Sequence, residues 1–362
     1  MKILVYGAGP LGSLLAGRLQ RGGNEVSLLA RGRRLAELQE HGVVEVDVRT
    51  DRRMVTRVDV VEALAPEDAY DLVLVVMRKN HALEILPVLA ANRNSPNVLF
   101  LMNNAAGPGE LVDALGEERV LIGFPSAAGH LEGPVVHCLA GTAEEPTPVP
   151  FGEVDGRITE RTREVARILE SGWGMGAEIR TDMDIWLKYH VALLMPALVP
   201  ALYAAGTDNY RLARTRDLLV LTVRGVREGF RVLRSLGLPV TPARFRVFQW
   251  LPEPVVVLML RRLLANELME TAMVAHAEAA RDEMKHLADE FRALAESTPV
   301  ETPVIDRLYP YFDPQAPQVP EGRAEIPMRW GGVVAGVAIL AAVVAGVVVW
   351  RRATCQESEP LL

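Results

Sequence analysis

Short apolar runs of strand length recur along the first half of the chain and alternate with helical patterns. The runs cover residues 3–6, 25–30, 71–77, 98–102, 120–123, 135–139, 148–152 and 178–180, and a charged helical pattern covers 158–171. Strands that alternate with helices are typical of a parallel, doubly wound sheet. We therefore predict an α/β domain of the Rossmann type over residues 1–181.

The pattern changes after residue 181. From 182 to about 297 the chain is rich in Ala, Leu and Arg and has few strand patterns, and one long helical pattern covers 267–297. These features predict an all-helical second domain over residues 182–308.

A linker and an apolar segment follow. Residues 309–329 are rich in proline, which predicts irregular backbone. Trp330 precedes a run without a charged or strongly polar side chain over 331–349, and Trp350 and a polar tail over 351–362 come after it. At about 1.5 Å per residue the run spans nearly one hydrocarbon core, and its flanking tryptophans suit the two interfaces. We predict a single transmembrane helix over 330–350, because a buried core helix would not be separated from its domain by such a linker.

The orientation of this anchor depends on opposing features. Arg351 and Arg352 favour a cytoplasmic tail, whereas Arg323 and Arg329 favour a cytoplasmic body. The opening residues lack the uninterrupted apolar core and cleavage site of a signal peptide, so we expect a single-pass protein with a cytoplasmic body. The Gly332-x-x-x-Gly336 spacing is compatible with a homodimer.

Charge and cysteine content exclude several classes. The 362 residues carry a formal net charge of −7, which argues against a nucleic-acid partner. The only cysteines, Cys138 and Cys355, lie far apart, so we expect neither a disulfide framework nor a metal site.

A glycine-rich turn follows the first predicted strand. It has the spacing G-x-G-x-x-G and comprises Gly7, Gly9, Pro10, Leu11 and Gly12. With a strand before it and a helical pattern after it, this spacing predicts that a dinucleotide pyrophosphate lies on the N-terminus of the helix. An ordinary strand–turn–helix is the alternative.

The end of the second strand bears on the choice of cofactor. It carries no acidic residue and is followed by Arg31, Arg33 and Arg34. An acid there would bind a ribose 2′-hydroxyl, whereas arginine accommodates a 2′-phosphate, so the sequence favours NADP(H) over NAD(H). A solvated basic turn is the alternative.

Six segments together resemble the ketopantoate reductase (2-dehydropantoate 2-reductase) family over about residues 1–308. They are GAGPLG at 7–12, the arginine-rich end of the second strand, LFLMNN at 99–104, FGE at 151–153, DIWLK at 184–188, and DEMKHL at 282–287 followed by TPV at 302–304. The resemblance implies NADPH-dependent reduction of a 2-keto acid to a 2-hydroxy acid, with pantothenate synthesis as the pathway.

The resemblance also implies roles for individual residues. Lys188 matches the lysine that acts as general acid, and Glu283 matches the glutamate that holds substrate. The cofactor-binding positions are Arg31 at the 2′-phosphate, Asn103 near the nicotinamide, and Arg78 where the family usually has a lysine. We add three substrate candidates: Asn104, His190 and Thr271.

The chain departs from the family at positions that usually carry substrate-binding asparagines. These positions hold Ala192, Pro196 and Ala288, and Asn104 replaces a glycine. The departures fit either a less polar substrate or a loss of catalysis. We therefore expect a divergent, membrane-anchored reductase of the family, and the alternative is a non-catalytic NADP(H)-binding sensor or scaffold tethered at a membrane.

Overall fold

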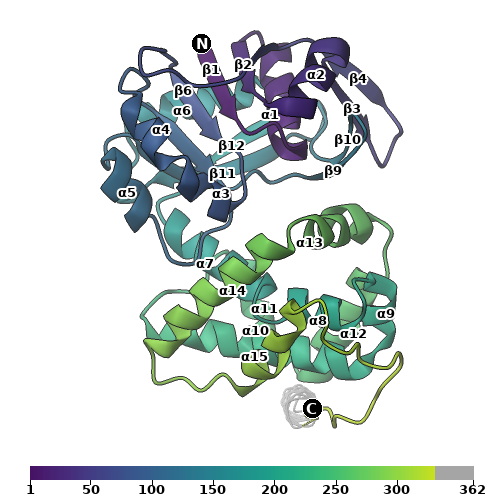
Figure 1. The fold of residues 1–362 in the computed structure, drawn as a ribbon. Coiled ribbons are helices and arrows are strands. Elements are labelled where there is room, and N and C mark those ends of the chain that lie inside the picture. Colours follow the sequence, from purple (N-terminus) through teal and green to yellow (C-terminus); the bar gives the residue numbers. More distant parts are fainter. Residues whose placement is uncertain (331–362) are drawn as a thin grey trace, which may run out of the picture.

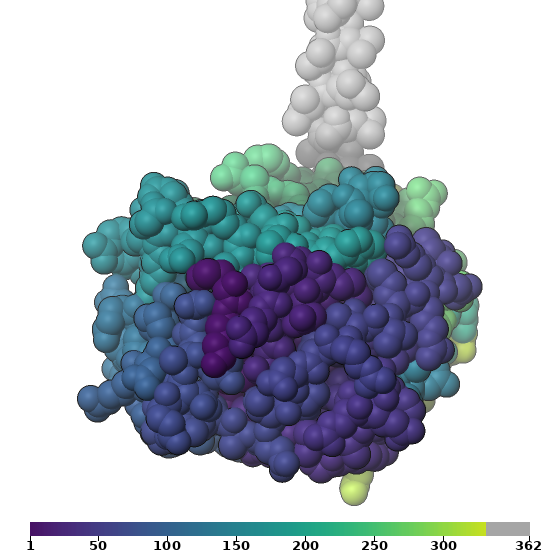
Figure 2. Space-filling view, turned by 90° about the horizontal axis from the view of Figure 1, so that it is seen from above, coloured from purple at the N-terminus to yellow at the C-terminus, as the bar shows by residue number. Residues whose placement is uncertain are grey.

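The computed structural model describes residues 1–330, which form an α/β domain and a helical domain (Figure 1). The elements of the first domain are β1 (Lys2–Tyr6), α1 (Pro10–Arg21), β2 (Glu25–Leu29), α2 (Gly32–His41), β3 (Val43–Asp47), β4 (Arg53–Thr56), β5 (Asp59–Val61), β6 (Leu72–Val75), α3 (Lys79–Glu84), α4 (Leu86–Ala91), β7 (Val98–Leu101), α5 (Gly109–Leu115), β8 (Val120–Gly123), β9 (Ala128–Glu132), β10 (Val135–Leu139), β11 (Thr147–Glu153), α6 (Glu160–Ser171) and β12 (Met175–Ile179). Seen from above in Figure 2, this domain fills the visible face, and the helical domain emerges only at its edges.

The main sheet is doubly wound. Its strand order is β12-β11-β8-β7-β6-β1-β2-β5, and β11 pairs antiparallel with β8 while the other pairs are parallel. The chain builds outward from β1 on one side and then returns to place β6 on the other side of β1. This reversal makes the carboxyl ends of β1 and β6 the switch point, where open α/β sheets bind ligands. The predicted Rossmann architecture is confirmed.

A second, smaller sheet has the order β4-β3-β10-β9. The sequence predicted residues 135–139 as a strand but did not separate them from the main sheet, and it missed β3, β4, β5 and β9. These strands have three to five residues, and β3, β4 and β9 mix charged with apolar side chains. Such short segments lack a periodicity that can be distinguished from a loop.

The second domain is helical, as predicted. Its elements are α7 (Met183–Leu194), α8 (Leu198–Ala204), α9 (Asn209–Arg214), α10 (Arg216–Ser235), η1 (Ala243–Arg246), α11 (Val247–Trp250), α12 (Glu253–Leu264), the π-helical turn η2 (Glu270–Val274), α13 (Ala275–Ala279), α14 (Arg281–Glu296), α15 (Pro303–Leu308) and η3 (Tyr309–Phe312). The long helical pattern over 267–297 is not one helix. It breaks at Ala280, whose φ of −129° and ψ of 37° lie outside the helical region.

Helix α7 belongs to two hydrophobic cores. Met183, Trp186 and Leu187 pack with the sheet of the first domain, whereas Tyr189 and Val191 pack in the core of the helical domain. A helix that is buried in both cores fixes the two domains to each other. It also places the intervening residue, Lys188, at the domain interface.

The proline-rich segment has no helix or strand after η3, but it is tied to the helical domain. Val319 N–H donates to Ala204 O, and the carboxylate of Asp217 accepts the N–H groups of Glu325 and Ile326. The segment expected as a linker therefore lies along the surface of α8 and α10. These hydrogen bonds, which sequence composition does not encode, hold it there.

The predicted transmembrane helix and the Gly332-x-x-x-Gly336 spacing lie outside the described residues, apart from Trp330. Within residues 1–330, one helical stretch, Met183–Ala204, is long and apolar enough to cross a membrane, with a mean hydropathy of 1.5. Its most apolar window is 78% buried inside the protein, as in a core helix, so it is weak evidence for a membrane span.

Candidate active site

The glycine-rich turn lies at the switch point of the sheet. Gly7 has a φ of +118°, and a Cβ there would lie 2.4 Å from the carbonyl oxygen of Val76. A Cβ on Gly12 would lie 1.8 Å from the oxygen of Gly7, whereas a Cβ on Gly9 would meet no atom within 4 Å. The outer two glycines are therefore required by the fold. The middle glycine leaves open space beside the backbone, which the close approach of a pyrophosphate requires.

The N-terminus of α1 points its free N–H groups into this turn. The helix begins at Pro10, and within residues 1–330 no side chain caps it. The N–H groups of Leu11 and Gly12 have no intrahelical partner, because first-turn donors precede the first helical hydrogen bond. Together with the helix dipole they can hold a phosphate, so the turn fits a dinucleotide.

Arg31 follows β2 and lies next to Tyr6, the residue before the glycine turn. Its Nε donates to Glu62 O at 3.2 Å, and Nη2 lies 3.4 Å from the hydroxyl of Tyr6. The guanidinium is exposed and bonds no carboxylate within the described residues. Its charge is therefore available to an anion at this edge of the sheet.

Arg34 contacts the glycine turn directly. Its Nε donates to Ala8 O at 3.2 Å and its Nη2 to Ser13 Oγ at 3.0 Å, so its guanidinium spans the turn and the first residues of α1. Both Arg33 and Arg34 pair with Glu37, but the side chain of Arg33 is 90% exposed, whereas that of Arg34 is 14% exposed. The helical spacing of α2 turns the two arginines to different faces.

A buried lysine follows β6 at the domain interface. The Lys79 side chain is 1% exposed, and its Nζ forms an ion pair with Glu290 and donates to Asn104 Oδ1 at 2.8 Å. Burial lowers the pKa of Lys79, and the Glu290 carboxylate opposes that shift. Lys79 was not among the site residues predicted from sequence, although its position just beyond the carboxyl end of β6 could have selected it.

Glu290 joins the two domains. It comes from α14, and its Oε2 accepts the N–H groups of Ala105 and Ala106, at 3.2 and 3.3 Å, in the loop after β7. Its Oε1 also lies 3.2 Å from His286 Nε2. The sequence analysis missed Glu290, although it lies two helical turns after Glu283 and therefore on the same face of α14.

Lys188 lies against the same loop. The side chain of Asn104 forms two hydrogen bonds with Gly107. Its Oδ1 accepts the N–H of Gly107 at 2.8 Å, and its Nδ2 donates to the oxygen of Gly107 at 2.9 Å. A Cβ on Gly107 would lie 3.1 Å from Lys188 Nζ, and the lysine forms an ion pair with Asp184 one helical turn earlier. The loop therefore contacts both Lys79 and Lys188. Asn104, which we expected at the substrate, has its amide committed to this loop.

Glu283 is buried beside Lys79. It is 3% exposed, and its Oε1 accepts the backbone N–H of Lys79, the first residue of α3, at 3.2 Å. Its Oε2 lies 3.6 Å from His276 Nε2. Burial raises the pKa of Glu283 to about 7. This carboxyl can therefore hold or release a proton near neutral pH.

Arg78 binds the helical domain rather than the glycine turn. Its Nη1 lies 3.0 Å from Asp282 Oδ1, and it also donates to Ala279 O. Asn80 donates to the other oxygen of Asp282 at 2.9 Å. These contacts make Arg78 part of the junction between α3 and α14.

Asn103 carries an unpartnered polar atom. Its Oδ1 is buried and accepts no hydrogen bond within the described residues. A buried amide oxygen without a donor is unfavourable and fits a donor on a ligand, such as a carboxamide N–H. Asn103 follows β7 at the same edge as the glycine turn, so this observation also fits a nicotinamide.

The other two substrate candidates have different surroundings. His190 packs with Phe124 and Trp186, at ring-centroid distances of 4.4 and 5.2 Å, and burial lowers its pKa to about 4. Thr271 lies in η2, which packs against β9 and β10. No hydrogen bond within residues 1–330 links either side chain to Lys188 or Glu283.

The positions where the family usually has asparagine lie in the helical core. Ala192 is 0% exposed and Ala288 is 2% exposed, and both pack in the same hydrophobic cluster. A Cβ on Gly229 would lie 3.4 Å from the Cβ of Ala192. These close contacts leave the alanine positions packed with apolar neighbours.

Comparisons with known proteins agree with this architecture. The family model for ketopantoate reductase PanE/ApbA matches residues 3–154. The oxidoreductase YkpB of Bacillus subtilis is 26% identical over 250 residues, which cover 67% of this chain and 78% of the relative. The 2-dehydropantoate 2-reductase of Archaeoglobus fulgidus is 27% identical over 240 residues, which cover 65% of this chain and 75% of the relative.

A solved structure shows the same fold. D-mandelate dehydrogenase with NADH and anilino(oxo)acetate aligns with a TM-score of 0.69 at 16% identity, over 86% of this chain and 97% of that chain. The relatives and the fold identify the class of protein as an oxidoreductase with a Rossmann domain and a helical domain. Within that class, the chain is similar to the ketopantoate reductase PanE/ApbA family over residues 3–154 and to curated 2-dehydropantoate 2-reductases at 27% identity.

Proposed function

We propose that this chain is an NADPH-dependent reductase that converts a 2-keto acid of the 2-dehydropantoate type into the 2-hydroxy acid. One observation carries the proposal. The open glycine turn lies against Val76 at the end of β6, and three residues later the chain reaches the buried Lys79. Lys79 contacts Glu283 and the loop after β7, and Lys188 lies against the same loop. A dinucleotide site and a cluster of buried cations and carboxyls therefore share one edge of the sheet.

The cluster supplies the proton chemistry that such a reduction needs. NADPH, when bound, supplies the hydride that adds to the ketone carbon. Negative charge then develops on the ketone oxygen, and Lys188 Nζ–H can donate the proton that neutralises it. Asp184 pairs with the ammonium and holds its Nζ near the loop after β7. Glu283, with a pKa of about 7, can accept a hydrogen bond from the substrate or donate one to it.

The arginines after β2 support NADPH as the cofactor. Arg31 has no carboxylate partner within the described residues, and Arg34 spans the turn beside it. A 2′-phosphate is the anion that distinguishes NADPH from NADH, and a guanidinium can bind it bidentately. The solved relative that holds NADH shows that the fold also serves the cofactor without that phosphate.

We also propose that residues 330–350 anchor the body to a membrane, with the body on the cytoplasmic side. The length of the apolar run and its flanking tryptophans support the anchor, and Arg323 and Arg329 before it support a cytoplasmic body.

A non-catalytic NADP(H)-binding module is the second candidate. The observation that favours it is the placement of Ala192 and Ala288 in the helical core, where the family usually has polar residues. The two candidates differ in turnover and not in cofactor binding.

The test follows NADPH oxidation by absorbance with a panel of 2-keto acids. We expect turnover by the parent chain and a loss of about 10²–10⁴-fold in Lys188→Ala, with NADPH affinity nearly unchanged. Lys285→Ala is a matched control, because that lysine is half exposed on α14. NADPH binding without turnover of any 2-keto acid would favour the second candidate, and equal turnover in Lys188→Ala and the parent would remove Lys188 from the mechanism.

A further inference from the structure

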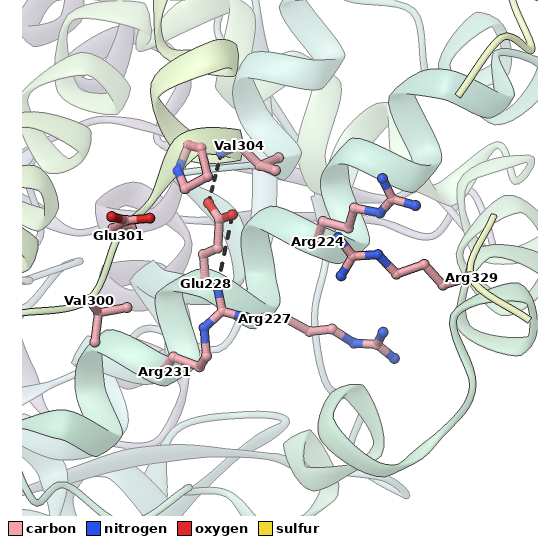
Figure 3. Close-up of a pocket in the computed structure, with 9 residues that line it drawn as sticks. Arg224, Arg227, Glu228, Arg231, Val300, Glu301, Val304 and Arg329 are labelled. Atoms are coloured by element: carbon pink, nitrogen blue, oxygen red, sulfur yellow. Dashed lines mark hydrogen bonds and ion pairs between the residues drawn. The ribbon is translucent and has the colours of Figure 1, made fainter. Parts of the chain in front are cut away.

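A cavity of about 420 Å³ lies in the helical domain, away from the candidate active site (Figure 3). In Figure 1, α15 lies on the side of the helical domain that faces away from the sheet, and α10 packs against it in the middle of the domain. It is lined by Arg224, Arg227, Glu228, Arg231, Val300, Glu301, Pro303, Val304 and Arg329. Four arginines thus meet at one cavity, and three of them come from successive turns of α10.

Two of the lining arginines, Arg227 and Arg329, form no side-chain ion pair with a carboxylate among residues 1–330. The Nε of Arg227 donates to Phe248 O at 2.8 Å and its Nη2 to Leu251 O at 2.6 Å. Burial lowers the pKa of Arg227, the nearby Glu253 carboxylate opposes that shift, and the charges of Arg329 and Arg224 lower the pKa further. Three guanidinium groups therefore lie near one carboxylate, and an added anion would relieve their mutual repulsion.

The carboxylates at this cavity are largely engaged. Glu253 forms a two-pronged ion pair with Arg224, both distances being 2.9 Å. Glu228 accepts two N–H groups from the first turn of α15, each at 3.0 Å, and lies 3.9 Å from Arg231. Glu301 is exposed at the rim. The charges of Arg227, Arg231 and Arg329 are thus only partly compensated.

An exposed apolar surface adjoins the cavity. The α12 helix packs on α10, and its first-turn Glu253 accepts the N–H of Arg329 at 2.9 Å. Large apolar side chains point to solvent from this region: Trp250 (75% exposed), Val255 (38%), Leu258 (48%), Met259 (49%), Leu263 (56%) and Trp330 (55%). Such a concentration of exposed apolar side chains is typical of an interaction surface. Arg261 and Arg262 are exposed beside them.

The apolar run begins next to the cavity in the sequence, and this restricts which partner the surface can contact. Arg329 lines the cavity, Trp330 follows, and the apolar run begins at residue 331. Two residues span at most about 7 Å. If the run enters a bilayer, the cavity lies at the depth of the lipid headgroups, where phosphates are concentrated.

We call the arginine cavity and the exposed side of α11 and α12 the juxtamembrane face. We propose that this face binds the surface of an anionic phospholipid bilayer. Arg227, Arg231 and Arg329 donate hydrogen bonds to the lipid phosphate, and the apolar side chains enter the bilayer interface. Arginine suits phosphate, and tryptophan and basic clusters next to a membrane segment suit an anionic leaflet. This inference rests on the anchor proposed above and not on the catalytic role of Lys188.

The test uses the full chain in lipid nanodiscs. Met259→Cys, in a Cys355→Ser background, carries a fluorescent label, while Cys138 is buried and protected. Lipids with a spin-labelled headgroup quench the label when α12 touches the bilayer. We expect stronger quenching in discs of phosphatidylcholine with phosphatidylglycerol than in discs of phosphatidylcholine alone.

Variants assign the effect to the cavity. Arg227→Gln with Arg231→Gln should lower the ratio of docked to undocked body by roughly twentyfold. Arg231→Gln alone should lower it about fivefold without disturbing the bonds of Arg227, and Arg231→Lys should restore most of it. Arg234→Gln is the matched control, since it is exposed on the same helix but does not line the cavity.

Each contrary outcome has a distinct meaning. Equal quenching in neutral and anionic discs overturns the proposal. Stabilisation of the chain in neutral discs by inorganic phosphate, lost in the double variant and accompanied by equal quenching, would assign the cavity to a soluble anion instead. Failure to enter either disc would refute the anchor, while NADPH turnover, measured separately, would still report on the proposed reductase.

Discussion

The Lys79–Glu290 pair offers the sharpest test of how the two domains are held. In Glu290→Gln the buried ammonium of Lys79 keeps only its 2.8 Å bond to Asn104, and with a side chain 1% exposed it cannot be rehydrated. Leaving one partner of a buried ion pair alone costs about 3–5 kcal/mol of unfolding free energy. The glutamine oxygen can still accept the N–H groups of Ala105 and Ala106, so we expect a value of about 3 kcal/mol.

The measurement is urea unfolding of the full chain in detergent, followed by tryptophan fluorescence. Removing both charges, in Lys79→Met with Glu290→Gln, should recover most of the loss, because no buried charge is then left unpaired. Asp289→Asn is the matched control on α14. It breaks the half-exposed pair with Lys285 and should change stability by about 0.5 kcal/mol. A Glu290→Gln chain within about 1 kcal/mol of the parent, or strictly additive effects in the double variant, would refute the reasoning.

Three further predictions follow from the site. Gly9→Ala should keep the melting temperature but weaken NADPH binding. Gly12→Ala should lower the melting temperature, since its Cβ would lie 1.8 Å from a carbonyl oxygen. Thermal melts measure stability, and fluorescence titration measures NADPH binding. The pKa of Glu283 rises from 4.5 to about 7 on folding, so the folded chain binds more protons between these pH values, and stability should fall by up to about 3 kcal/mol as pH rises through this window. Unfolding of Glu283→Gln across that range should lack this slope. Arg31→Ala should raise the dissociation constant of NADPH about tenfold and leave NADH binding unchanged. Arg33→Ala is the control, because the Arg33 side chain faces solvent. Equal losses of affinity for both cofactors would contradict a 2′-phosphate contact.

The glycine turn could be recognised from sequence because its requirements are local. Gly7 adopts a positive φ. Gly12 cannot carry a Cβ, because the carbonyl oxygen of Gly7, five residues earlier, lies against it. Both constraints act within one strand–turn–helix unit, so residue spacing records them directly. The same holds for the alternation of strands and helices that predicted the Rossmann domain.

The buried polar network could not be recognised in the same way. Lys79 and Glu290 are 211 positions apart, and each is an ordinary charged residue on a short or charged helix. What makes them a buried pair is the docking of α14 on the end of β6 and on the loop after β7. For the same reason the sequence did not predict that the amide of Asn104 contacts Gly107 and Lys79.

By itself, the sequence determined the fold class, the place of the glycine turn, the helical nature of the second half and the apolar run over 331–349, because each depends on the periodicity or chemistry of neighbouring residues. Tertiary structure alone decided which charges are buried together. It also decided that α7 serves two cores and that α10 and Arg329 gather arginines at one cavity. The physical reason is that burial and electrostatic pairing depend on distances through space, which only the packing of remote elements sets.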